Sequence, residues 1–230
     1  MLKSTLLDAL QDRVLIYDGA MGTQIQGSNL TDADFILRPE HGHSPALAAA
    51  AERLNGTLLD GCNEILSITR PEVIRNIHAA YFEAGSDLVE TNTFGGTSIV
   101  LAEYDIPELV YDLSLASARI AKEAALAAST TAKPRWVVGA LGPGTKLISL
   151  GQTTWEELEE TYKTGFVGLI EGGADALLLE TLQDLLMVKA GVVAAEKAMA
   201  ETGKRLPLFV QVTMEQTGTM LLGSEIGAAL

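Results

Sequence analysis

The phrase Phe82-Glu-Ala-Gly-Ser-Asp-Leu-Val-Glu-Thr91 occurs again, in a longer form, as Ile170-Glu-Gly-Gly-Ala-Asp-Ala-Leu-Leu-Leu-Glu-Thr181. In both copies helical sequence stops at a glycine, a small residue and an Asp form a turn, and a short apolar run ends on Glu-Thr. Glycine commonly ends helices, and a short apolar run bounded by turn residues suits a buried strand. The phrase therefore predicts a helix-strand unit that the chain uses more than once.

Three further apolar runs lead into polar or glycine-rich sequence, at Val14–Tyr17, Trp136–Ala140 and Leu208–Val212. With the two phrases they predict five strands, and helical patterns separate all but the first from the strand before. The predicted helices cover about Ser4–Gln11, Ala46–Leu54 after the cap Ser44-Pro45, Pro71 up to a stop at Gly85, Pro107–Ala128, Thr154–Glu171, Asp184–Glu201, and the beginning of one at Ser224–Leu230. Strands that alternate with helices indicate a parallel α/β sheet.

The least regular segment, at about 26–68, reads as a long excursion after the first strand. It contains the pair His41-Gly-His43 and the stretch Cys62-Asn-Glu-Ile-Leu66. Two histidines on either side of a glycine usually lie in a solvated loop, and a lone cysteine is more often packed in the interior than reactive. We therefore expect no metal site in the excursion.

The composition bounds the function. The chain has 230 residues, 47% of them hydrophobic, which suffices for a large core. Its net charge of −14 and the lack of a basic stripe argue against nucleic acid as a partner. No apolar run is long enough to span a bilayer, the N-terminus does not resemble a signal peptide, and there is a single cysteine. These features predict a cytoplasmic protein without a membrane partner.

Two architectures are built from parallel strands and helices: the open doubly wound sheet and the closed eight-stranded barrel of the TIM type. After the first strand only Gly19 and Gly22 are present, so the Gly-x-Gly-x-x-Gly pattern of an open dinucleotide-binding sheet is incomplete. The glycine-rich stretch 139–146 is also a poor phosphate-binding loop, because Pro143 removes an amide donor and Thr145 separates Gly144 from Lys146.

Carboxylates follow several different strands, at Asp18, Glu90, Glu180 and Glu215. Residues from many strand ends converge at the mouth of a (β/α) barrel, which favours that architecture. Five strand-helix units are present where closure needs eight. We therefore expect the chain, 1–230, to be the N-terminal part of a barrel, with apolar surface exposed along both edges of an open sheet.

Through most of its length the sequence closely resembles the homocysteine S-methyltransferase family, and within it the homocysteine-binding module of cobalamin-dependent methionine synthases. The resemblance is carried, in order, by stretches that include Asp18-Gly-Ala-Met-Gly-Thr23, Cys62-Asn-Glu-Ile-Leu66, Thr69-Arg-Pro71, Glu90-Thr-Asn-Thr-Phe94 within residues 81–97, Gly139-Ala-Leu-Gly-Pro143, Glu180-Thr-Leu-Gln-Asp184 and Val210-Gln-Val-Thr-Met214. It implies a TIM barrel and transfer of a methyl group from methylcobalamin, derived from methyltetrahydrofolate, to zinc-activated homocysteine, which gives methionine.

The resemblance also implies residue roles. Asp18 and Glu180 match positions that hold the ammonium of homocysteine, Gly19 would let backbone amides approach its carboxylate, and Thr91 would donate a hydroxyl. Glu90, Asn92 and Thr93 would brace the site. Without a ligand, the same residues would be ordinary turn residues and helix caps.

The family holds zinc with three cysteines, and the resemblance places those positions beyond Leu230. We therefore expect no catalytic or metal-binding residue and no bound zinc or cobalamin in this chain, which alone would be inactive. In the complete enzyme its partners would be homocysteine and the folate-binding and cobalamin-binding modules.

Two alternatives stay open: an inactive remnant that binds an amino acid, and a betaine-dependent or S-methylmethionine-dependent homocysteine methyltransferase. An aldolase-type barrel fits less well, because no Lys stands at a strand end.

Overall fold

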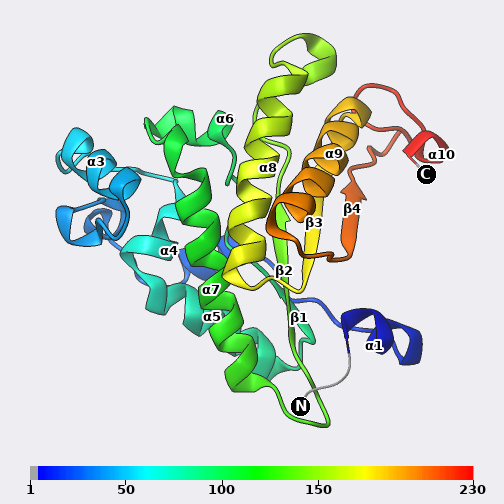
Figure 1. Cartoon of the computed structure of the whole chain (residues 1–230), viewed down its shortest axis with the longest axis horizontal. Helices are drawn as coiled ribbons and strands as arrows, with labels where there is room; N and C mark the ends of the chain where they lie inside the picture. Colours follow the sequence, from blue (N-terminus) through cyan, green and yellow to red (C-terminus); the bar gives the residue numbers. More distant parts are fainter. Residues whose placement is uncertain (1–4, 230) are drawn as a thin grey trace.

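The computed structural model describes residues 5–229, and its centre is a parallel sheet of four strands (Figure 1). In the described chain the strands are β1 (Leu88–Glu90), β2 (Trp136–Leu141), β3 (Ala176–Leu182) and β4 (Leu208–Val212). Each strand pairs with the next one along the chain, in the order β1-β2-β3-β4. This is the α/β fold with a parallel sheet that the repeated phrase predicts.

Four long helices cover one face of the sheet (Figure 1). They are α5 (Pro71–Ala84), α7 (Val110–Ala128), α8 (Trp155–Gly172) and α9 (Leu185–Thr202). The predicted boundaries hold because they rest on local chemistry. Pro71 opens α5, a capping box between Thr154 and Glu157 opens α8, and the Asp184 carboxylate accepts the Leu186 N–H at the start of α9.

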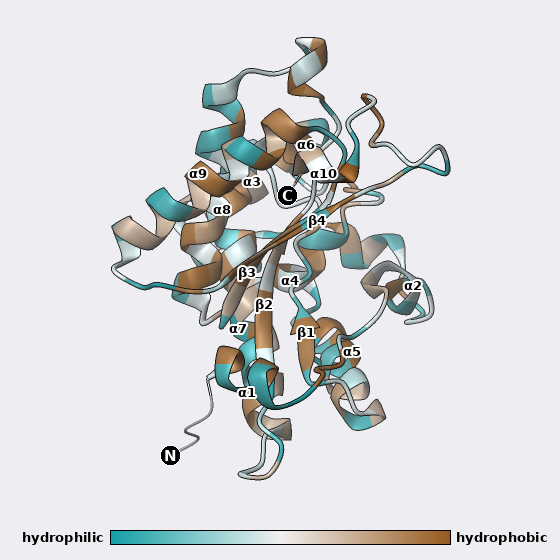
Figure 2. Ribbon diagram, turned by 90° about the vertical axis from the view of Figure 1, so that its right-hand side faces the viewer, coloured by the Kyte–Doolittle hydropathy of each residue, from teal (hydrophilic) through white to brown (hydrophobic). Residues whose placement is uncertain are grey.

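The alternation of side chains divides the sheet residues between two cores. Val89 and Val137 pack against α5 and α7, and Leu177 packs against the helices that follow. The intervening residues Leu88, Trp136, Val138, Ala140, Ala176 and Leu178 form the opposite face, together with Leu6 and Ala9 of α1 (Leu6–Asp12). Figure 2 shows the strands largely in the colour of hydrophobic residues. Strands β1, β2 and β3 are therefore largely buried on both faces, as parallel sheets usually are.

The predicted first strand, Val14–Tyr17, requires a correction. It runs beside β1 as extended chain, with Ile16 O accepting the Leu88 N–H (3.2 Å) and Asp18 N–H donating to Leu88 O (3.1 Å), but it is not a regular strand. The reason is that the Ile16 N–H donates to the carboxylate of Asp87 (2.9 Å) instead of to a backbone carbonyl. The five predicted strands are thus four strands and one flanking segment.

Both edges of the sheet are open. Val14 is 86% exposed on the flanking segment, and Val210 is 41% exposed on β4 at the other edge. Apolar side chains on an unpaired edge are a template for further pairing. This agrees with an arc of a barrel.

The part of the chain that follows the flanking segment, before α5, consists of short elements. They are α2 (Met21–Gln26), η1 (Asp32–Phe35), η2 (Pro39–His41), α3 (Pro45–Leu54), η3 (Asn63–Ile65) and α4 (Leu66–Thr69). Leu37, Leu47 and Cys62 contribute to a separate core under it. The remaining elements are α6 (Ser98–Leu101), η4 (Ala102–Tyr104), η5 (Pro107–Leu109), η6 (Ile148–Leu150) and α10 (Ile226–Ala229). Ser4 and Leu230, the predicted limits of the first and last helices, lie outside the described residues.

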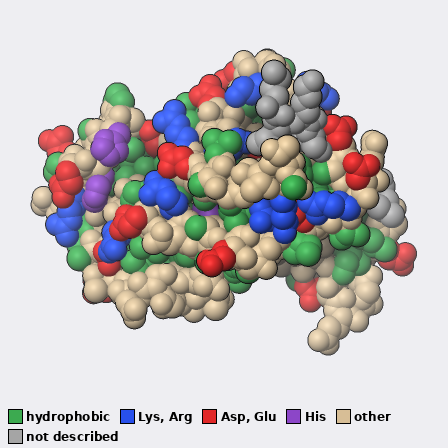
Figure 3. All heavy atoms as spheres, turned by 90° about the horizontal axis from the view of Figure 1, so that it is seen from below, with side chains coloured by type: hydrophobic (Ala, Val, Ile, Leu, Met, Phe, Trp, Pro, Cys, Tyr) green, Lys and Arg blue, Asp and Glu red, His purple; other side chains and the backbone are tan. Residues whose placement is uncertain are grey.

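The surface shows no single dominant sign of charge on the face seen from below, where Lys and Arg side chains lie among Asp and Glu (Figure 3). The ion pairs of the described chain include Arg13–Asp87 and Lys122–Asp175. Within residues 5–229 no helix is long and apolar enough to cross a membrane.

Candidate functional site

A cavity of about 380 Å³ opens at the carboxyl ends of the strands. Three parts of the chain line it: residues 18–22 at the end of the flanking segment, residues 90–94 at the end of β1, and Glu180 in β3. The cavity is bordered by all seven residues to which the resemblance gives roles, namely Asp18, Gly19, Glu90, Thr91, Asn92, Thr93 and Glu180, whereas the fourth strand-end carboxylate, Glu215, does not line it. Parallel strand ends converge on one side of a sheet, which explains why residues so distant in sequence meet here.

The cavity is strongly acidic. Burial, followed by the negative charges of Glu90 and Glu180, raises the pKa of Asp18 to about 7, although the N–H of Glu90 partly offsets this by donating to Asp18 Oδ2 (3.0 Å). Burial and the neighbouring Glu90 raise the pKa of Glu180 to about 7 as well. Burial also raises the pKa of Glu90. Three half-buried carboxyl groups without a lining Lys or Arg favour a ligand with a positive charge.

An irregularity in β3 accompanies Glu180. Between Leu179 and Leu182 the register slips, so that β3 has one residue more than β4. Within the slip Thr181 has a φ of 59°, which is rare for a β-branched residue. Such a bulge redirects a side chain. It leaves Glu180 at the cavity while Leu182 returns to the core under the helices.

We expect Thr181→Gly to stabilise the fold by about 1 kcal/mol, because glycine adopts a positive φ without steric cost. The same change loosens the backbone that presents Glu180, so ligand affinity should fall. Urea denaturation and a ligand titration on the same variant measure both effects. A variant that is less stable than the parent chain would show that the conformation of Thr181 is not strained.

Packing against Tyr81 explains why residue 19 is a glycine. A Cβ at this position would lie 3.1 Å from the hydroxyl oxygen of Tyr81 and 3.3 Å from its ring. The Tyr81 hydroxyl donates to Ala20 O (3.1 Å), so the side chain from α5 holds the turn that follows Asp18. The sequence gives no signal for this contact, because Tyr81 reads as one of the core positions of its helix.

The hydroxyl of Thr91 is engaged within the protein. It accepts the Ala140 N–H (3.0 Å), and Thr93 donates to Ala140 O (2.6 Å). The 2.6 Å contact between the two threonine hydroxyls therefore has Thr91 as its donor. Thr91 lines the cavity but has no spare proton for a ligand, which favours a role in bracing β1 against β2 over the donor role expected from the resemblance.

Asn92 and two residues of the excursion hold the loop after β1 in place. The Asn92 side-chain amide donates to Asn63 O (2.8 Å), and its backbone N–H donates to Ser117 Oγ (2.8 Å). Glu64, whose carboxyl group is buried, accepts the Gly95 N–H (2.7 Å). Sequence reasoning missed Glu64 and Ser117, because nothing local marks a residue whose partner lies on another element.

The residues present do not fit the zinc site that the family implies. Cys62 is buried among Leu59 and Ile65 and does not line the cavity, and burial, then Glu64, raises the pKa of its thiol to about 12. His41 Nδ1 accepts the Arg38 N–H (3.0 Å). His78 is buried in α5, where desolvation lowers its pKa to about 4. Among residues 5–229 no three His, Cys, Asp or Glu side chains are grouped to hold a metal.

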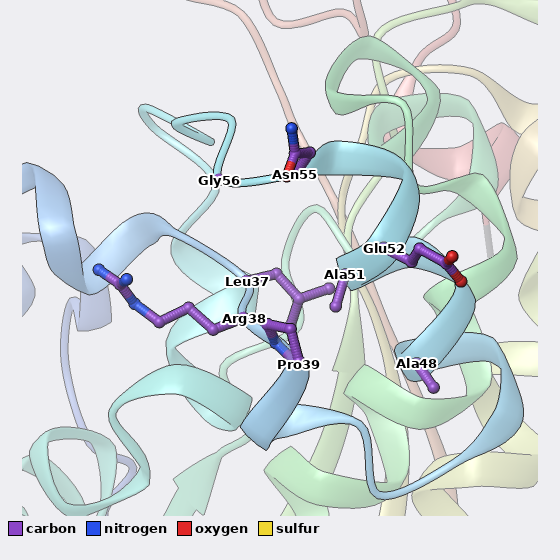
Figure 4. A pocket seen from close by; sticks show the side chains of 8 residues that line it. All are labelled: Leu37, Arg38, Pro39, Ala48, Ala51, Glu52, Asn55 and Gly56. Atoms are coloured by element: carbon purple, nitrogen blue, oxygen red, sulfur yellow. The ribbon is translucent and has the colours of Figure 1, made fainter.

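A second cavity, of about 530 Å³, lies between α3 and residues 37–39. Figure 4 shows that its two charged side chains, Arg38 and Glu52, point away from one another. Leu37 and Ala51, which also line it, are buried apolar residues. Because its polar groups do not converge, this cavity is a weaker candidate than the one at the strand ends.

Comparisons with known proteins show which proteins the chain is similar to. The family model described as homocysteine S-methyltransferase matches residues 15–230. The chain is 48% identical over 225 residues to the methionine synthase of Mycobacterium leprae (strain TN) and 47% identical over the same length to that of Mycobacterium tuberculosis (strain ATCC 25618 / H37Rv). Both alignments cover 98% of this chain but only 17% of the relative.

A similar fold is present in a solved structure, the metallated form of the homocysteine methyltransferase MmuM from Escherichia coli. The two share 21% identity with a TM-score of 0.69, over 97% of this chain and 72% of that one. At this identity the likeness concerns the fold alone.

Proposed function

The chain belongs to the homocysteine S-methyltransferase family, and from this premise we propose that the acidic cavity binds the amino acid homocysteine. The observation that carries the proposal is the convergence of Asp18, Glu90 and Glu180 at one cavity. An α-ammonium group offers three hydrogen bonds and a positive charge, and thereby compensates carboxylates that are costly to bury alone. Asp18 and Glu180 hold the ammonium, and backbone amides near Gly19 face the ligand carboxylate.

The complete enzyme would be a methionine synthase, of which this chain supplies the homocysteine-binding part. The chain spans 17% of the length of the methionine synthases it matches, so further modules that bind folate and cobalamin would supply the methyl group. Zinc, when bound, would activate the thiol of homocysteine. Because Cys62 is buried and does not line the cavity, the zinc ligands would be residues outside those described, and the chain alone would bind without catalysis.

Calorimetric titration of the 230-residue chain with L-homocysteine tests the proposal. Bound ammonium requires ionised carboxylates, so binding should release a proton from groups whose pKa lies near 7. We expect the affinity to rise about tenfold between pH 6 and pH 8 for one proton released. The control ligand is 4-mercaptobutanoate, which lacks only the ammonium and should not bind. An affinity that does not change with pH, or equal binding of the control, would refute the ammonium assignment.

A further inference from the structure

Phe94 is a large aromatic side chain that is 51% exposed at the same cavity as Asp18 and Glu180. An exposed phenylalanine on a mobile loop needs no explanation. Phe94, however, stands between Asn92 and Gly95, both of which form hydrogen bonds with other elements.

The packing of Phe94 fixes its ring. Its carbonyl oxygen accepts the Gly142 N–H (3.0 Å). Ring atoms Cδ2 and Cε2 lie 3.0 Å from the position that a Cβ of residue 142 would occupy, so only glycine lets the ring lie against this strand end. A ring fixed on one side and open on the other presents a rigid apolar wall, which costs little conformational entropy when a ligand binds.

The neutral side chains that share the cavity with Phe94 have no free hydrogen-bond donor. The hydroxyl protons of Thr91 and Thr93 and the side-chain N–H groups of Asn92 are all donated to protein groups. The ionic side chains of the lining are carboxylates, which do not donate when ionised. A hydroxyl oxygen at the end of a ligand side chain would therefore exchange water for the ring without gaining a side-chain donor, whereas sulfur makes favourable contacts with aromatic rings.

We propose that Phe94 determines the side-chain specificity of the site: its ring contacts the bound amino acid beyond Cβ and selects sulfur over hydroxyl. This inference rests on the proposed function. It adds a residue whose role is in discrimination rather than in holding the charged end of the ligand.

The matched ligands L-homocysteine and L-homoserine test it, because they differ only in sulfur against oxygen. The ratio of their dissociation constants cancels every contribution of the ammonium and carboxylate. In the parent chain we expect homocysteine to bind at least tenfold more tightly than homoserine. In Phe94→Ala this ratio should fall about five- to tenfold, while the dissociation constant of homoserine changes less than about twofold.

Two further variants complete the design. Phe94→Leu keeps an apolar wall without the ring, and its ratio should lie between those of the parent and Phe94→Ala. Leu126→Ala removes a side chain that is 61% exposed on α7 and does not line the cavity, so its ratio should equal that of the parent.

The outcomes separate the two proposals. If Phe94→Ala weakens both ligands equally, or leaves the ratio unchanged, Phe94 only supports the loop, and the inference is wrong while homocysteine binding stands. If the parent chain binds neither ligand, the proposed function fails and takes the inference with it.

Discussion

Glu180→Gln should weaken the binding of homocysteine by about 1.5–3 kcal/mol, which is the usual worth of a hydrogen bond to a charged group. Glutamine keeps the size of the side chain and the bulge that directs it, but it removes the negative charge that an ammonium requires. Calorimetry at pH 8 measures the loss. Glu83→Gln is the matched control, because Glu83 is exposed on α5 and does not line the cavity. Unchanged affinity in Glu180→Gln would refute the role of this carboxylate.

The same substitution should stabilise the folded chain at high pH. The pKa of Glu180 is raised from 4.5 to about 7 in the folded state, so its contribution to stability is fully present below 4.5 and is lost as the pH rises through 7. Glutamine carries no charge and avoids this loss. With allowance for partial solvent screening, we expect a gain of about 1–2 kcal/mol at pH 8 and little difference at pH 4, measured by urea denaturation. Lower stability of the variant at pH 8 would show that the buried charge is compensated.

The helices and the three cavity carboxylates could be predicted from the sequence because their signals are local. Each signal affects residues only a few positions away, as with the cap Thr154, the proline at the start of α5 and the apolar runs before Glu90 and Glu180. Parallel strands then bring the polar ends together whatever the details of packing. Fold class and the position of the site follow from these two facts.

The features that the sequence did not indicate all depend on a distant partner. Tyr81 explains Gly19 only when α5 is packed against the turn after Asp18. The Thr91 hydroxyl accepts the Ala140 N–H only because Ala140 lies opposite on β2. The bulge at Thr181 arises from pairing with β4, which begins more than twenty residues later. Local propensity carries no information about such pairs.

The Asp of the repeated phrase has a role that becomes visible only in the sheet. In the first copy, Asp87 Oδ2 accepts the Ile16 N–H of the flanking segment (2.9 Å). In the second copy, Asp175 Oδ2 accepts the Val137 N–H of β2 (2.9 Å). Each Asp also pairs with a cation, so in each copy the turn before a strand holds the neighbouring segment at its beginning.

Asp87→Asn should therefore cost about 3 kcal/mol of stability at pH 7, the largest loss we predict. The Asp87 side chain is only 2% exposed, and both of its oxygens accept from the Arg13 guanidinium at 2.8 Å. An amide cannot match this bidentate pair, and it carries no charge to balance Arg135, whose side chain is 9% exposed and lies 3.9 Å from Asp87 Oδ1. Asp175→Asn is the matched control: its side chain is 25% exposed, and we expect a loss of about 1 kcal/mol.

The pH dependence distinguishes a lost ion pair from a merely altered shape. The Arg13 guanidinium, more than any other group, lowers the pKa of Asp87 below 3.8, the ordinary value of an Asp side chain. The stabilisation is therefore present above that value and is lost as the pH falls through the folded-state pKa. Urea denaturation should show the parent chain and Asp87→Asn converging as the pH is lowered below 3.8. A difference that stays constant down to pH 2 would mean that the charge of Asp87 contributes nothing, and that the flanking segment which presents Asp18 is held by its backbone hydrogen bonds alone.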